Sequence, residues 1–195
     1  MVDLCFATNN RNKIAEISQI LGRDFAILSL GDIGCKQELP ENQDTLEGNS
    51  LEKARFVFDR YGLSCFADDT GLEVDALNGD PGVLSARYAG EQKNSDDNIQ
   101  LLLSNLTGEK NRSARFRTVI TLVRPRGIKQ FEGTVEGTIL SSRRGDKGFG
   151  YDPVFQPVGI SRSFAELSMK EKNQISHRAL AFRKLVEYLK EHPIA

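Results

Sequence analysis

Two adjacent carboxylates, Asp68 and Asp69, directly follow residues 63–67, an apolar run that is typical of a buried strand. In open α/β sheets, sites form beyond the carboxyl ends of strands, so this strand would deliver both acids to such a site. Neighbouring carboxylates point to different sides, so one can bind a metal while the other braces the loop. Mg²⁺ prefers one or two carboxylates with waters and substrate phosphates, and a third acid such as Glu41 could complete its shell. The alternative is an ordinary turn, because residues 68–71 are all of turn-forming types.

A polar loop between a predicted strand and a predicted helix is the second candidate: Thr8-Asn9-Asn10-Arg11-Asn12-Lys13. Free backbone N–H groups at a helix start attract anions, and Lys13 in the first turn could fold back onto a phosphate. The loop matches neither the dinucleotide-binding glycine motif nor a P-loop, which argues against those two classes. Alternatively, Asn10 or Asn12 simply caps the helix and Lys13 is solvated.

A glycine-rich segment, residues 145–153, is the third candidate. Glycines on both sides of Phe149 let the backbone approach a flat ligand, and the Phe149 ring offers a stacking face. Asp152 can accept a hydrogen bond from a ring N–H. The alternative is a hairpin-like glycine loop with Phe149 packed in the core, although a second aromatic residue, Tyr151, close to Gly150 favours a ligand site.

Cationic donors gather near the last predicted helix, where Lys172 precedes Ser176-His177-Arg178. Ser176 is a plausible N-cap, which would place His177 and Arg178 in an exposed first turn. The helix dipole disfavours cations there, so three donors suggest an acceptor-rich partner such as a base carbonyl. Alternatively, Arg178 pairs with Glu171 or Glu166, and His177 is a surface residue. Two further candidate phosphate ligands, Lys53 and Arg87, rank lower, because each could equally be a solvated surface residue or an ion-pair partner.

Elements that position these residues follow from apolar periodicity and glycine stops. A strand over residues 2–7 precedes a helix that carries Ile14 and Ile17 and stops at Gly22. The next helix runs from about Leu46 to Tyr61 and ends at Gly62. The spacing places four apolar residues on one face of this helix: Leu51, Ala54, Phe58 and Tyr61.

In the second half of the chain, the sequence pattern predicts a β-hairpin that is preceded and followed by helices. A helix capped by Ser95 ends at Gly108, and residues 114–123 and 130–140 alternate like two strands around a Pro125-Arg126-Gly127 turn. A short helix over residues 165–172 and a final helix from about Ser176 complete the pattern. Alternating strands and helices with a central hairpin indicate an α/β protein with a mixed sheet.

Composition narrows the class further. The 195 residues carry 26 basic and 27 acidic side chains, so bulk charge provides no grip on nucleic acid. No apolar run is long enough to span a membrane, and the acidic first residues do not resemble a signal peptide. Three cysteines without a CxxC pair favour neither disulfides nor a zinc site. These features predict a cytoplasmic protein.

Five segments in order resemble the inosine triphosphate pyrophosphatase family, whose members hydrolyse non-standard purine nucleoside triphosphates such as dITP and XTP. They are Ala7-Thr8-Asn9-Asn10-Arg11-Asn12-Lys13, Ala67-Asp68-Asp69-Thr70-Gly71-Leu72, Pro81-Gly82 with Ser85-Ala86-Arg87-Tyr88, Gly148-Phe149-Gly150-Tyr151-Asp152-Pro153, and Ile175-Ser176-His177-Arg178. The resemblance covers nearly the whole chain. One departure is Asn9, which stands where the family usually places glycine.

The resemblance implies a single domain, residues 1–195, with a long twisted mixed sheet flanked by helices, two lobes around a central cleft, and a homodimer. It implies that residues 8–13, with Thr70 nearby, hold the triphosphate. Asp69 would act on the attacking water and bind Mg²⁺ with Glu41. Residues that would surround the base are Phe149, Gly150, Tyr151, Asp152, Lys172, His177 and Arg178.

The reaction that we expect is metal-assisted hydrolysis of the α–β bond, which releases a nucleoside monophosphate and pyrophosphate. Arg178 or Lys172 would donate a hydrogen bond to a carbonyl at position 6 of the purine, whereas the amino group of ATP would face them donor against donor. Two alternatives remain open: a related pyrophosphatase that acts on other modified nucleotides, and a non-catalytic nucleotide sensor.

Overall fold

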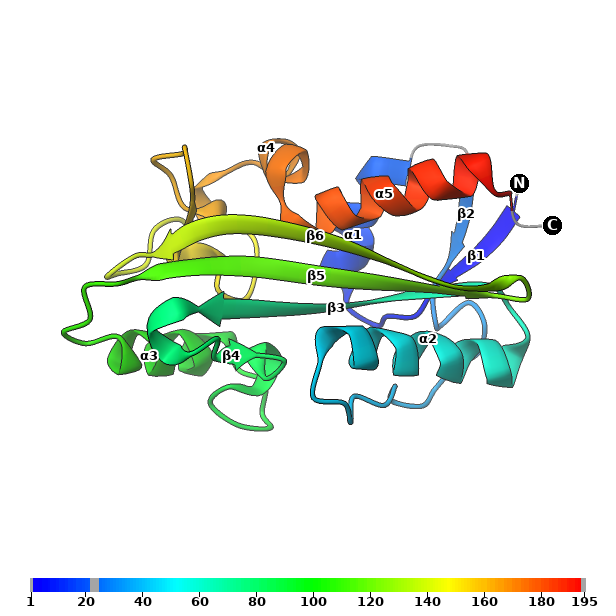
Figure 1. Cartoon of the computed structure of the whole chain (residues 1–195), viewed down its shortest axis with the longest axis horizontal. Helices are drawn as coiled ribbons and strands as arrows, with labels where there is room; N and C mark the ends of the chain where they lie inside the picture. Colours follow the sequence, from blue (N-terminus) through cyan, green and yellow to red (C-terminus); the bar gives the residue numbers. More distant parts are fainter. Residues whose placement is uncertain (1, 22–24, 194–195) are drawn as a thin grey trace. The chain divides into compact units, whose positions relative to one another are not determined.

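The computed structural model describes residues 2–21 and 25–193 and has the α/β class that the sequence predicts (Figure 1). The strands are β1 (Val2–Phe6), β2 (Phe25–Leu28), β3 (Cys65–Val74), β4 (Pro81–Gly82), β5 (Ser113–Arg124), β6 (Gly127–Ile139) and β7 (Phe155–Pro157). The α-helices are α1 (Arg11–Leu21), α2 (Leu46–Tyr61), α3 (Ser95–Asn105), α4 (Met169–Ile175) and α5 (His177–Glu191). Four 3-10 turns complete this part: η1 (Asp75–Leu77), η2 (Ser85–Arg87), η3 (Asp152–Val154) and η4 (Phe164–Glu166).

The described strands form one mixed sheet in the order β2-β1-β3-β5-β6-β7, and β4 pairs with β3 outside this path. β1 is parallel to β2 and to β3, with Cys5 opposite Cys65. β4 runs antiparallel to β3, and β7 runs antiparallel to β6. The predicted mixed sheet is therefore confirmed, including the hairpin of β5 and β6 around Pro125 and Arg126.

The chain divides into two compact units. Unit 1 comprises Met1–Asp69, Thr118–Gly133 and Arg178–Ala195, and unit 2 comprises Thr70–Arg117 and Thr134–His177. Strands β3, β5 and β6 each contribute residues to both units.

Unit 1 has an apolar core on each side of its strands, because successive residues of a strand point to opposite faces. Leu4 and Phe6 pack with α1 and α5 residues, whereas Cys5 and Ala7 pack with α2 residues. Figure 1 shows α2 and α5 on opposite sides of the unit 1 strands.

Helix α2 has the predicted bounds, and its predicted apolar residues Leu51, Ala54, Phe58 and Tyr61 pack in one core, although its buried face extends beyond them. Thr45 caps its first turn through Oγ1, which accepts a hydrogen bond from the Gly48 N–H at 3.0 Å. Gly62 ends it at φ +66°, in the left-handed region that favours glycine. Its buried residues are Leu46, Asn49, Ser50, Lys53, Ala54 and Val57. The predicted apolar face is therefore only partly right, and the buried face includes three polar side chains.

Unit 2 packs α3 and an aromatic group around the remaining halves of the strands. Phe116, Phe155 and Phe164 are all buried, with ring centroids 4.7 to 6.1 Å apart. Asn94, not the predicted Ser95, caps α3, because its Oδ1 accepts from the Asp96 and Asp97 N–H groups.

Three predicted boundaries differ from the structure. Residues 68–71 continue β3 as far as Val74 instead of ending the strand or forming a turn. The predicted helix over residues 165–172 is two pieces, η4 and α4, separated at Ser168, whose hydroxyl accepts from the Glu171 N–H to cap α4. Helix α1 ends at Leu21, and the predicted stop at Gly22 lies outside the described residues.

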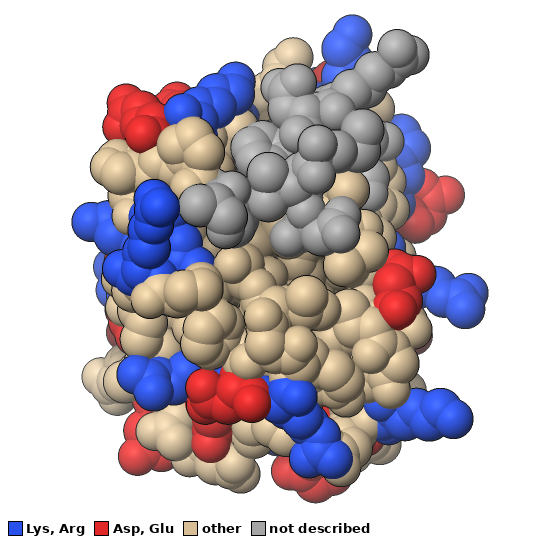
Figure 2. Space-filling model, turned by 90° about the vertical axis from the view of Figure 1, so that its right-hand side faces the viewer, with Lys and Arg blue, Asp and Glu red and all other residues tan. Residues whose placement is uncertain are grey.

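Among the described helices, none is long and apolar enough to cross a membrane. Figure 2 shows one face of the molecule, on which residues of both charge signs lie around an uncharged centre. The described part of this face therefore lacks the basic stripe that marks a nucleic-acid surface.

Candidate active site

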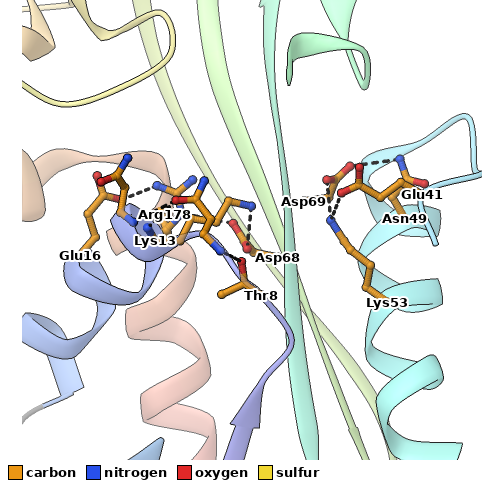
Figure 3. A network of polar contacts seen from close by, with 11 residues as sticks. Thr8, Lys13, Glu16, Glu41, Asn49, Lys53, Asp68, Asp69 and Arg178 are labelled. Atoms are coloured by element: carbon orange, nitrogen blue, oxygen red, sulfur yellow. Dashed lines mark hydrogen bonds and ion pairs between the residues drawn. The ribbon is translucent and has the colours of Figure 1, made fainter. Parts of the chain in front are cut away.

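Asp68 and Asp69 lie side by side in β3, and their carboxylates point to opposite faces of the strand (Figure 3). Asp68 is 1% exposed and Asp69 is 8% exposed. The expectation that the two acids serve different sides is confirmed, although they lie inside a strand and not at its end. Each carboxylate meets its own set of buried cations and donors.

Asp68 lies against Lys13 and Arg178. The Lys13 Nζ donates to Asp68 Oδ1 at 2.9 Å, and the Arg178 Nε donates to Asp68 Oδ2 at 3.2 Å. Arg178 also donates to Glu16 of α1. Burial alone would raise the Asp68 pKa, but Lys13 and Arg178 outweigh it and hold this pKa well below its ordinary value. Asp68 is therefore a structural anion that holds two cations in place.

Asp69 lies against α2. The Lys53 Nζ donates to Asp69 Oδ1 at 2.8 Å and to Glu41 Oε1 at 2.9 Å, so it joins the two acids. The Asn49 amide donates to Asp69 Oδ2 at 3.2 Å. Burial raises the pKa of Asp69, although the Lys53 charge opposes this shift. Burial alone would lower the Lys53 pKa, but Asp69 and Glu41 outweigh it and raise this pKa.

The loop between β1 and α1 presents exposed polar side chains at a helix start. Asn10 caps α1, since its Oδ1 accepts from the Asn12 N–H at 3.0 Å and the Lys13 N–H at 3.3 Å. The Thr8 hydroxyl accepts from the Asn10 N–H at 3.2 Å. The capping alternative is thus confirmed for Asn10, but a solvated Lys13 is wrong, because its side chain is 16% exposed and paired with Asp68. The exposed residues of this segment are Asn9 and Asn10 in the loop and Arg11 and Asn12 in the first turn of α1.

In unit 2, the glycine-rich segment is organised around Asp152. Asp152 Oδ2 accepts from the Lys172 Nζ at 2.6 Å and from the Phe149 N–H at 2.9 Å. The same Nζ lies 4.9 Å from the centroid of the half-buried Phe149 ring. Gly148 has φ +76°, and a Cβ there would collide with Asp152, so only glycine allows this close approach.

The other unit 2 candidates are more buried than expected. Tyr151 is a core residue whose hydroxyl donates to the Ser85 carbonyl at 2.9 Å, and burial raises its pKa. Thr70 and Arg87 are half-buried, in β3 and at the end of η2.

The prediction of an exposed first turn of α5 is wrong. His177 and Arg178 are 3% and 2% exposed, and the His177 ring stacks on Phe116 with centroids 4.7 Å apart. The suggested pairing of Arg178 with Glu171 or Glu166 is wrong as well. Glu171 binds Arg162 at 2.7 Å, and Glu166 accepts from the Ser163 N–H.

Sequence reasoning missed Asn49 and Glu16 and ranked Lys53 too low. Asn49 and Lys53 are one helical turn apart on α2, and Glu16 follows Lys13 by three residues on α1, so each pair shares a helix face. That spacing is a signal that could have indicated a common site.

Glu41 and Asp69 could bind a cation that needs only a few ligands from the protein. No cluster of three or more His, Cys, Asp or Glu side chains that could hold a metal occurs among the described residues. Glu41 and Asp69, however, share Lys53 as a cationic partner, and the Glu41 side chain is 32% exposed. Two carboxylates completed by water and phosphate oxygens are the environment that Mg²⁺ prefers.

Comparison with known proteins gives consistent results. Residues 4–188 match the model of the Ham1 family. A dITP/XTP pyrophosphatase from Flavobacterium johnsoniae is 54% identical over 186 residues, which cover 95% of this chain and 97% of the relative. A dITP/XTP pyrophosphatase from Porphyromonas gingivalis is 56% identical over 190 residues, covering 97% of this chain and 98% of the relative.

Solved structures agree with the family match. The Ham1 protein of Staphylococcus aureus has a TM-score of 0.89 at 37% identity and covers 97% of this chain and 98% of its own. A HAM1 protein from Coxiella burnetii has a TM-score of 0.90 at 36% identity and covers 98% of this chain and 100% of its own. The chain belongs to the Ham1 family.

Proposed function

We propose that the protein hydrolyses the non-standard purine nucleoside triphosphates ITP, dITP and XTP at the α–β bond, to a nucleoside monophosphate and pyrophosphate. Such an enzyme is a nucleoside-triphosphate pyrophosphatase that removes these nucleotides from the pool. The names of the relatives at 54% and 56% identity support this substrate class. The observation that supports the reaction type is the pair of β3 acids: Asp68 binds Lys13, and Asp69 binds Lys53, which also binds Glu41.

The triphosphate is the partner that we assign to the loop after β1 and to Lys13. The loop offers the polar side chains of Thr8, Asn9, Asn10, Arg11 and Asn12. Lys13 pairs with Asp68 in the structure, and a phosphate could share this cation because its side chain is still partly exposed. Thr70 follows the two acids along β3 and would donate its hydroxyl to the same phosphates.

Asp69 is the group that we assign to the attacking water, whose proton it would accept. Lys53 holds its Oδ1 and leaves further lone pairs for that water. Glu41 and Asp69 would hold Mg²⁺, which when bound neutralises phosphate oxygens and helps to position the water. Lys53 would keep the two acids close to each other before the cation binds.

The base is the partner that we assign to the glycine-rich segment and the donors near α5. Phe149 and Gly150 would lie along the flat ring, while Tyr151 supports the segment from the core. Asp152 would accept from a ring N–H, and Lys172, His177 and Arg178 would donate to its acceptors. A carbonyl at position 6 suits these donors, whereas the amino group of adenine would face donor against donor, a mismatch worth ~10⁴ in selectivity.

The proposal extends to the whole chain: residues 1–195 form a single catalytic domain that works as a homodimer in the cytoplasm. The described part of the face in Figure 2 carries no basic stripe, which supports a free nucleotide, and not a nucleic acid, as the substrate.

Identification of the products tests the reaction. ITP is incubated with the protein and Mg²⁺, and the products are separated by ion-exchange chromatography. We expect IMP and pyrophosphate in equal amounts. IDP and phosphate would show cleavage of the β–γ bond and would contradict the proposed reaction.

A further inference from the structure

Asn49 is a buried side chain whose two polar atoms both have partners in unit 1. It is 1% exposed. Its Oδ1 accepts from the Gln43 N–H at 2.9 Å, and its Nδ2 donates to Asp69 Oδ2 at 3.2 Å. A backbone N–H can only donate, so Oδ1 must face Gln43 and the amide nitrogen must face the carboxylate. The orientation of this side chain is therefore determined by its surroundings.

Asn49 and Lys53 share the task of holding Asp69. They lie one turn apart on α2, and each donates to a different oxygen of the carboxylate, Asn49 to Oδ2 and Lys53 to Oδ1 (Figure 3). Two donors on one rigid helix fix both the position of the carboxylate and the rotation of its plane. Lys53 alone would fix one oxygen and leave the plane free to turn.

The same amide also holds the segment that carries Glu41. Gln43 follows Glu41 by two residues, and its N–H is bound by Asn49. Glu52, also on α2, accepts from the Asn42 N–H at 2.9 Å. The segment before α2 is thus attached to the helix at two successive residues, next to the point where Lys53 binds Glu41.

We infer that Asn49 is a positioning residue for the hydrolytic step: it holds the Asp69 carboxylate in the orientation needed to accept a proton and keeps Glu41 in register with it. This inference rests on the proposed function. A catalytic group must be held within about 0.5 Å and 10–20° of its productive geometry, so loss of this donor lowers kcat more than it weakens nucleotide binding.

Asn49→Asp tests the donor separately from the acceptor. The new side chain has the same shape and keeps an oxygen for the Gln43 N–H, but it turns an oxygen, not an N–H, toward Asp69. We expect kcat for ITP at saturating Mg²⁺ to fall at least tenfold, on the order of one lost hydrogen bond to a charged group, while KM stays within about twofold. Asn49→Ala, which removes both contacts, should lower kcat at least as much.

Asn98→Asp is the matched control. Asn98 is 4% exposed, accepts from the Ala89 N–H at 2.7 Å and donates to the Ala86 carbonyl at 3.0 Å. It belongs to unit 2, and its hydrogen-bond partners are backbone groups of Ala89, Ala86 and Ser85, to which no catalytic or binding role is assigned. The same substitution at a similar burial should lower Tm and leave kcat within about twofold of the unchanged protein, measured well below Tm.

The outcomes separate this inference from the proposed function. Hydrolysis of ITP by the unchanged protein tests the function, and the variants then test the inference. A kcat within about twofold of the unchanged protein in folded Asn49→Asp would overturn it. So would a kcat loss that Asn98→Asp reproduces at an equal fall in Tm, since the role would then be only structural. If Asn49→Asp does not fold, Asn49→Ala and Asn49→Ser decide the question in the same way.

Discussion

Asp68 and Asp69 face different partners, so we expect the same Asp→Asn substitution to lower turnover at Asp69 and stability at Asp68. Asp69→Asn should lower turnover of ITP about 10²- to 10⁴-fold, because the amide cannot accept the proton of the water. Nucleotide binding should persist, and Tm should change little because Lys53 keeps Glu41 as a partner. Steady-state kinetics measures the turnover, and calorimetry measures nucleotide binding. Near-normal turnover would refute the role of Asp69.

Asp68→Asn should act on stability. Lys13 and Arg178 would lose the charge of a carboxylate that is 1% exposed. Breaking such a buried pair costs about 3–5 kcal/mol, or roughly 6–20 °C in Tm for a chain of this size. Thermal unfolding with and without the substitution measures it. An Asp68→Asn protein that is as stable as the unchanged one would contradict the role of Asp68 as the structural anion.

Arg178 provides a test of base selection that does not depend on the amount of folded protein. Arg178→Ala leaves Glu16 and Asp68 without this buried partner, so the folded fraction should fall. The ratio of kcat/KM for ITP to that for ATP is independent of this fraction. We expect the ratio to decrease, because a donor to position 6 is lost. An unchanged ratio would remove Arg178 from the base-recognising group.

The partners of Arg178 also show what the sequence can predict at this scale. Its position after Ser176 and His177 indicated a donor, but its acid Glu16 lies 162 residues away in the chain. No local pattern identifies a partner at that separation, so the nearer Glu166 and Glu171 were the available alternatives. Residue types were therefore predictable, and their pairings were not.

At the scale of elements, the ends of helices and strands were predicted correctly where a local residue sets them. They were predicted wrongly where contacts with distant residues set them. Gly62 ends α2 in the left-handed region, and the sequence shows that stop directly. Residues 68–71 are turn formers, yet β3 continues because β4 pairs with Leu72 and Glu73 and the Ser85 hydroxyl accepts from the Leu72 N–H at 2.8 Å. The buried face of α2 was only partly predicted, because it also carries Asn49, Ser50 and Lys53, which an apolar pattern omits.

Substitution of Gly148 tests the proposed role of the glycine-rich segment in nucleotide binding. Gly148→Ala would push Asp152 away from Lys172 and from the Phe149 N–H, besides straining a residue at φ +76°. We expect KM for ITP to rise at least about tenfold, the loss of a charge-assisted contact. Steady-state kinetics checks this.

Gly159→Ala is its control, because Gly159 has φ +80° with nothing within 4 Å of an added Cβ. This variant strains the backbone at a positive φ in the same way, but its Cβ collides with no neighbouring side chain. An equal rise of KM in both variants would show that backbone strain alone explains the effect, against the proposed role of Asp152.

At the scale of the whole molecule, β3, β5 and β6 are the link between the two units, since each contributes residues to both. Each unit has cores of its own, with Leu185 in unit 1 and Leu102 in unit 2, both fully buried. Continuous strands cannot lose pairing in one unit without affecting the other. We therefore expect a single cooperative unfolding transition.

Leu102→Ala and Leu185→Ala test this. Each should cost about 2–5 kcal/mol and lower one common Tm by roughly 4–20 °C. Calorimetry with far-ultraviolet circular dichroism measures it. Two transitions, of which each variant shifts only one, would contradict a shared folding unit.

We propose a metal-dependent pyrophosphatase that acts on ITP and XTP and rejects ATP through the group at position 6 of the purine. The most direct measurement is pyrophosphate release from ITP, XTP, GTP and ATP, each with Mg²⁺ and with a chelator. We expect Mg²⁺-dependent release from ITP and XTP, with ATP nearly untouched. No release from any of the four, or release from ATP as fast as from ITP, would contradict it.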